Sequence, residues 1–186
     1  INAFVGLTKL ESLDIANNTI SDLTALSSMT QLQKLNISNN PITTITYLNN
    51  CLALKTLSME SCGVSKLSAL AGNTSLEELY AANNEIEDIS VLSDCTALRV
   101  IDVSSNQISD ISILPSLPEL VNFKANNNKI TAIPKFDAET SKLVQFSANY
   151  NEITDVSGLA GLTALNYVRV DYNKVTDVYC LKDNWC

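Results

Sequence analysis

The stretch that decides the fold is residues 98–108, LRVIDVSSNQI, in which apolar side chains and one asparagine follow the frame L-x-x-L-x-L-x-x-N-x-I. The same frame recurs along the whole 186-residue chain. Its eight copies begin at residues 10, 32, 54, 76, 98, 120, 143 and 165. The interval is 22 residues, with one interval of 23. This regularity predicts a single repeat domain over 1–186, in which 1–9 is a partial repeat and 176–186 a terminal segment.

Each frame predicts a short strand followed by a turn. The fourth and sixth positions are apolar and two residues apart, as on the inward face of a strand. The apolar residues after the asparagine favour a 3₁₀ or irregular turn on the opposite side. One repeat cannot bury its own apolar face, so the repeats must stack, with strands ~4.8 Å apart in one parallel sheet. The ninth-position asparagines are expected to hydrogen-bond the backbone of neighbouring repeats.

The frame resembles the leucine-rich repeat family over almost the whole chain. The 22-residue length and the tail ISDISILPSLPEL (108–120) are similar to the internalin-type repeats of bacterial surface proteins. The resemblance implies an α/β-class right-handed solenoid whose parallel sheet forms a concave face. It also implies a non-enzymatic module that binds a protein ligand there, on or released from a bacterial surface. The leucine-rich regulatory subunits of protein phosphatase 1 carry similar repeats, so a cytoplasmic regulatory scaffold is an alternative. A structural spacer within a surface protein is another.

Composition narrows the possible functions. Lys and Arg number 12 and Asp and Glu 20, and the formal net charge of −8 disfavours nucleic acids and anionic membranes as partners. There is no histidine, which excludes histidine-dependent nucleophilic catalysis and histidine metal sites. No apolar run approaches the ~20 residues of a membrane-spanning helix. We expect a monomer without catalytic residues, metal, cofactor or membrane insertion.

Several sets of residues at equivalent positions of successive repeats have structural explanations. Asp22, Asp88, Asp110, Asp155 and Asp177 precede the predicted turns, where a carboxylate accepts backbone N–H groups. We expect Cys51, Cys62 and Cys95 to be buried core thiols. The extra residue of the 23-residue repeat, near Pro134, should bulge the side opposite the sheet.

The two ends of the chain are irregular. Cys180 and Cys186 lie near the C-terminal end and either form a terminal disulfide or remain thiols. Both ends of the chain fall part-way through a repeat, so we expect a fragment of a longer protein.

The third, fifth, seventh and eighth positions are predicted to point outward from the sheet, where they are free to vary. Four of the six tyrosines occupy these positions, and three of them gather near Arg169 in the last two repeats. Exposed Tyr and Arg carry much of the energy of protein interfaces. The predicted ligand-binding residues are Tyr80, Asp102, Lys124, Tyr150, Tyr167, Arg169, Asp171 and Tyr172. The alternative is that Tyr167 and Tyr172 only shield the open end of the solenoid.

Overall fold

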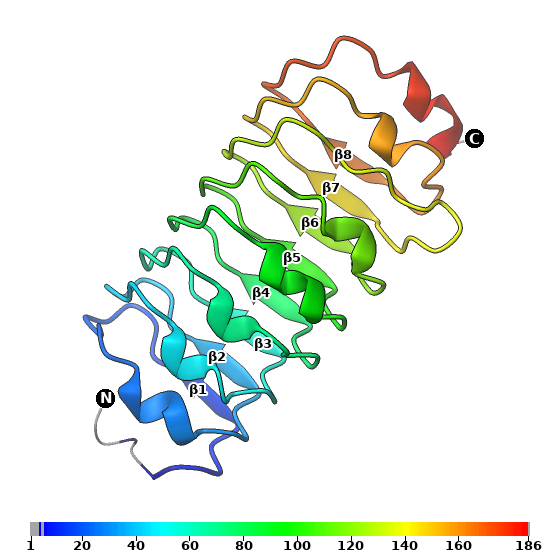
Figure 1. Cartoon of the computed structure of the whole chain (residues 1–186). Helices are drawn as coiled ribbons and strands as arrows, with labels where there is room; N and C mark the ends of the chain where they lie inside the picture. Colours follow the sequence, from blue (N-terminus) through cyan, green and yellow to red (C-terminus); the bar gives the residue numbers. More distant parts are fainter. Residues whose placement is uncertain (1–3, 5, 186) are drawn as a thin grey trace.

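The computed structural model describes residue 4 and residues 6–185, and its described residues form a stack of short strands (Figure 1). Every repeat frame contributes one three-residue strand at its third to fifth positions. The strands are β1 (Ser12–Asp14), β2 (Lys34–Asn36), β3 (Thr56–Ser58), β4 (Glu78–Tyr80), β5 (Val100–Asp102), β6 (Asn122–Lys124), β7 (Gln145–Ser147) and β8 (Tyr167–Arg169). They form one sheet in chain order, β1 to β8. The predicted leucine-rich repeat solenoid is therefore confirmed.

Equivalent positions of successive repeats lie side by side in this sheet. All seven strand pairs are parallel, and Leu13 pairs with Leu35 as Ile101 pairs with Phe123. The register continues across the 23-residue repeat, because Phe123 still pairs with Phe146. The extra residue is therefore accommodated outside the sheet.

Short 3₁₀ helices lie in the layer opposite the strands (Figure 1). They are η2 (Thr24–Ser28), η3 (Thr46–Leu48), η4 (Ser68–Leu70), η5 (Ser90–Asp94), η6 (Leu114–Ser116), η7 (Ser157–Leu159) and η8 (Tyr179–Trp185). The predicted role of the aspartate column is confirmed, since Asp88 Oδ1 accepts the N–H of Ser90 at 2.7 Å. This bond and the Ser90 hydroxyl lower the pKa of Asp88. The other four aspartates make the same contact with the second residue after them.

The core fills the space between the two layers. The inward residues of the strands pack there, and the rings of Phe123 and Phe146 lie 5.6 Å apart. Cys51, Cys62 and Cys95 are buried, as predicted. Burial raises the pKa of both Cys51 and Cys95 to about 11, so these thiols remain protonated at neutral pH. The terminal disulfide that the sequence offers between Cys180 and Cys186 involves Cys186, which lies outside the described residues.

The 23-residue repeat differs from the others on the helix side. Its residues 131–137 have no regular secondary structure and are followed by a turn at 138–140, where other repeats form a 3₁₀ helix. The N–H of Phe136 donates to the carbonyl of Gly158 in η7 at 3.1 Å. The extra length lies opposite the sheet, where the sequence places it. This segment also packs its backbone directly against η7.

Candidate functional site: the outer face of the sheet

Outward side chains at the third and fifth positions of the eight repeats, together with the exposed Tyr150, Asp171 and Tyr172 of the turns after β7 and β8, form one surface, which we call the sheet face. It is the surface that the sequence predicts to bind a ligand. Most of these side chains are exposed or half-buried. The backbone that carries them is fixed from below by two ladders of hydrogen bonds.

The first ladder consists of the ninth-position asparagines. The amide of Asn106 donates to the carbonyls of Ala81 at 2.9 Å and Val103 at 3.0 Å. Its oxygen accepts the N–H of Ile86 from the preceding repeat at 2.9 Å. At the one position where cysteine replaces asparagine, the Cys62 thiol donates to the carbonyl of Ile37 at 3.3 Å. The predicted structural role of this column is confirmed.

The second ladder corrects the sequence analysis at two of the eight seventh positions, all of which it expected to point outward. Ser38 and Asn149 occupy this position and are buried. The Ser38 hydroxyl oxygen accepts the N–H of Glu60 at 3.1 Å, and Asn149 Oδ1 accepts the N–H of Asp171 at 2.9 Å. Each of these side chains bonds the backbone of the next repeat. The signal in the sequence was the Ser or Asn at four of these positions, since such side chains can satisfy a buried backbone group.

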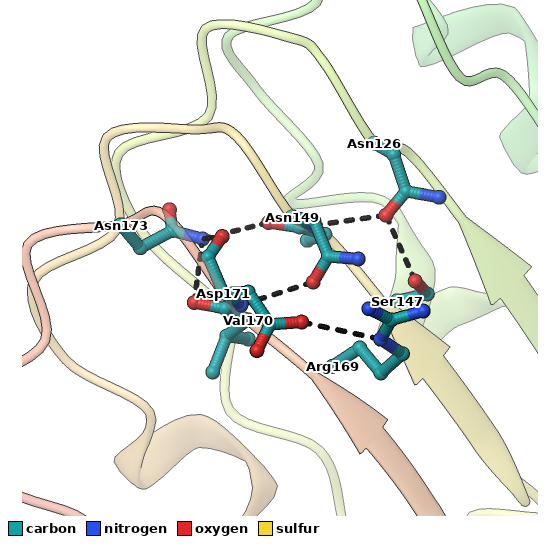
Figure 2. A network of polar contacts seen from close by, with 8 residues as sticks. Asn126, Ser147, Asn149, Arg169, Val170, Asp171 and Asn173 are labelled. Carbon is teal, nitrogen blue, oxygen red and sulfur yellow. Dashed lines mark hydrogen bonds and ion pairs between the residues drawn. The ribbon is translucent and has the colours of Figure 1, made fainter.

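Figure 2 shows this ladder beneath the last strands. Asn126 Oδ1 accepts the Ser147 hydroxyl at 2.8 Å and the N–H of Asn149 at 2.9 Å. Ser147 is consequently buried, although it occupies a fifth position that the sequence assigns to the outer surface. Within the described residues, every buried side-chain nitrogen or oxygen has a hydrogen-bond partner. The buried polar side chains under β7 and β8 are therefore fully hydrogen-bonded.

The predicted residues of the central strands are neighbours on the sheet face. Tyr80, Asp102 and Lys124 occupy the same row of β4, β5 and β6. Lys124 Nζ lies 3.9 Å from Asp102 Oδ2. The Tyr80 hydroxyl donates to Glu78 at 3.4 Å, and burial together with the Glu78 charge raises the pKa of Tyr80. Together with Glu78 this group carries a net negative charge, and its polar side chains already contact one another.

A second group gathers at β8 and the turns that follow β7 and β8. Arg169 Nε donates to Asp171 Oδ2 at 3.1 Å (Figure 2). The Tyr167 hydroxyl and the Asp171 carboxylate both raise the pKa of Arg169. The rings of Tyr150 and Tyr172 stack, with centroids 4.2 Å apart and planes 8° from parallel. In the fifth-position row, the small Ser147 separates Arg169 from Lys124, so the predicted residues form two groups.

Each eighth-position residue has a left-handed backbone, which turns the chain away from the sheet after every strand. The φ angles at these positions lie between 53° and 58°. Six of the eight residues are Asn or Ser, which are Asn17, Asn39, Ser61, Asn83, Ser105 and Asn127. The other two are Tyr150 and Tyr172. The sequence did not reveal this conformation at the two tyrosines.

In residue 4 and residues 6–185, no group of three or more His, Cys, Asp or Glu side chains is arranged to hold a metal ion. None of the helices in the described part of the chain has the length and apolar character needed to cross a bilayer.

Comparison with known proteins identifies relatives of this architecture. The family description "Leucine Rich repeats (2 copies)" matches residues 30–72, 74–116 and 96–138, which together exceed half of the chain. A second one, "Leucine rich repeat", matches residues 2–42. No curated protein matches the chain.

Three solved structures are similar to this chain. The internalin InlF of Listeria monocytogenes is 28% identical with a TM-score of 0.75, and the match covers 99% of this chain and 61% of that one. The internalin C2 of the same organism is 29% identical with a TM-score of 0.74, and the match covers 96% of this chain and 69% of that one. A leucine-rich repeat protein of Leptospira interrogans shares the fold, at 20% identity and a TM-score of 0.85. The match covers 95% of this chain and 48% of that one. The present chain thus spans about three fifths of the length of InlF.

Proposed function

This chain belongs to the leucine-rich repeat family, and from that premise we propose that it is a non-enzymatic module that binds a protein ligand on its sheet face. The observation that carries the proposal is the cluster at β8, where exposed Tyr150, Tyr167 and Tyr172 lie close to Arg169. Tyr and Arg are the residue types most enriched at the energetic centres of protein interfaces. We call these four residues, with Asp171, the β8 cluster.

The electrostatics and rigidity of the β8 cluster support this role. The Asp171 carboxylate lies 3.1 Å from Arg169 Nε and favours one orientation of the guanidinium before a ligand arrives. The hydrogen bonds of Asn126 and Asn149 fix the backbone beneath it. A surface with immobilised side chains loses less conformational entropy on binding. Tyr80, Asp102 and Lys124 extend the proposed contact surface along β4 to β6.

We place the protein outside the cell, on or released from a bacterial surface. The likeness to two internalins at 28% and 29% identity supports this location. The acidic net charge of −8 also fits a surface that selects protein partners over nucleic acid. Under this proposal the partner is a protein of another cell.

The first test is affinity capture with the immobilised chain, using extracts of cell-surface and of cytosolic proteins separately. We expect the wild type to retain a surface protein that a Tyr167→Ala/Arg169→Ala double variant retains at least tenfold less, because removing an interface hot spot costs about 2 kcal/mol or more. The Tyr47→Ala variant is the matched control, since Tyr47 is an exposed tyrosine on η3 in the opposite layer. This variant should retain the surface protein as strongly as the wild type does.

Three results would contradict the proposal. A partner retained equally by the double variant would show that the β8 cluster is not the contact surface. Capture from the cytosolic extract alone would favour the intracellular scaffold. Absence of capture from both extracts would favour the structural spacer.

A further inference from the structure

The stacked pair of Tyr150 and Tyr172 is unusual because both residues have a left-handed backbone. Their φ angles are 54° and 53°. This conformation is unfavourable for a bulky side chain and is tolerated by Asn and Ser more readily. The six other repeats accordingly place Asn or Ser at this position. Conformational strain of this kind is concentrated at functional sites, where the surrounding structure maintains it.

Burial does not explain why tyrosines occupy these strained positions. Tyr150 is 51% exposed and Tyr172 is 72% exposed, so the pair adds little to the core. The strained turn is instead held by backbone bonds beneath it, because the N–H of Tyr150 donates to the carbonyl of Asp171 at 2.9 Å. The side chain of Asn149 holds the N–H of Asp171 in the same way. The rings are therefore presented to solvent on a rigid base.

The geometry of the stack limits the group that it can accept. At a centroid separation of 4.2 Å and an interplanar angle of 8°, no space is left between the two rings for a ligand. A ligand must instead lie on an outer ring surface, and Tyr172 offers the larger one because of its higher exposure. A flat group that continues the stack makes the most contact with such a surface.

The charge around the stack selects among flat groups. The chain has a net charge of −8. A hydrogen bond with the Tyr172 hydroxyl raises the pKa of Tyr150, and burial and the Asp171 carboxylate add to this effect. The Arg169 guanidinium is already engaged by Asp171 and Tyr167. The electron-rich faces of the two rings and the negative net charge of the chain both favour a cation.

We propose that the Tyr150–Tyr172 stack is a recognition site for an arginine side chain of the protein partner, whose planar guanidinium lies on the exposed face of Tyr172. Arginine combines a positive charge with a flat shape, which lysine and neutral aromatic groups do not. This inference rests on the proposed protein-binding function and specifies the chemistry of the contact. The arginine would continue the stack at its exposed end.

The test uses nuclear magnetic resonance of the 186-residue chain, with the ring signals assigned through Tyr150→Asn and Tyr172→Asn. The probe is the blocked tripeptide acetyl-Gly-Arg-Gly-amide. Matched peptides carry lysine, or citrulline, which keeps the flat shape without the charge. We expect saturable shifts of both rings with the arginine peptide, and at least threefold weaker binding of the lysine and citrulline peptides. The shifts should vanish in Tyr172→Asn and persist in Tyr47→Asn.

A second readout separates recognition from a purely structural role. The Tyr150→Asn/Tyr172→Asn double variant carries the residue that four other repeats use, so its melting temperature should equal or exceed that of the wild type. A melting temperature lower by several degrees would show that the stack stabilises the end of the solenoid and would overturn the inference. Equal binding of the citrulline peptide, or no shift with arginine, would also overturn it. Capture of a surface partner that depends on Arg169 would still support the proposed function in that case.

Discussion

Replacing Asn106 by alanine is expected to lower the free energy of unfolding by about 3–5 kcal/mol, the largest effect that we predict for any single polar residue. The substitution removes the donors to the carbonyls of Ala81 and Val103 and the acceptor for the N–H of Ile86. The side chain is buried in the middle of the stack, so water cannot replace these bonds. Each buried backbone group left without a partner costs about 1–3 kcal/mol.

Asn18 is the matched control for this prediction. It occupies the same position in the first frame, where it is exposed and bonds to the carbonyls of Ile15 and Ala16 of its own repeat. The Asn18→Ala variant should lose no more than about 1 kcal/mol. Urea unfolding followed by circular dichroism and by tyrosine fluorescence measures both variants. Equal losses at the two positions would show that bonds between repeats are not the source of the stability.

Replacing Gly158 by alanine is expected to lower the free energy of unfolding by about 2–3 kcal/mol, as overpacking of a filled interior does. A Cβ atom at this position would lie 2.5 Å from the carbonyl oxygen of Pro134 and 2.6 Å from that of Ile133. Both contacts are with backbone, which cannot rotate away as a side chain does. The irregular segment of the 23-residue repeat or η7 must therefore shift.

The equivalent positions of other repeats provide a control for this prediction. Position 158 corresponds to Ala25, Ala69 and Val91, so a side chain is tolerated wherever the preceding repeat is regular. Ala25→Gly is the matched control and should itself lower stability, by about 0.5–1 kcal/mol, because glycine gains more freedom on unfolding. Gly158→Ala and Ala25→Gly would then both lower stability, although the two residues occupy equivalent positions of their repeats. A stabilised Gly158→Ala variant would contradict the described contact with the irregular repeat.

The sequence predicts the parts of this structure that depend on periodicity. A spacing of 22 residues is sufficient to place Leu13 beside Leu35 and Tyr150 near Tyr172, because equivalent positions must stack. The same spacing places every asparagine of the ladder beside the turn of the preceding repeat. The aspartate column and the three buried thiols follow from the chemistry of single residues at known positions of the frame.

The parts that the sequence did not predict depend on the backbone between the strand and the asparagine. Ser38 and Asn149 appear outward by alternation, but the strand ends before them and the chain turns them inward. The left-handed residue that follows sets this turn, and it is Asn or Ser in six repeats and Tyr in two. Neither the φ angle of a tyrosine nor the orientation of its ring is determined by the repeat period.

The most direct test of protein recognition by the sheet face is hydrogen–deuterium exchange of the chain alone and in complex with the captured partner. We expect slower exchange in peptides that contain β7, β8 and the turn at residues 170–173, together with β4 to β6 if the contact extends along the sheet. Peptides that contain η3, η4 and η5 should exchange equally in both states, because these helices lie in the opposite layer (Figure 1). Protection confined to the helix layer would contradict the account.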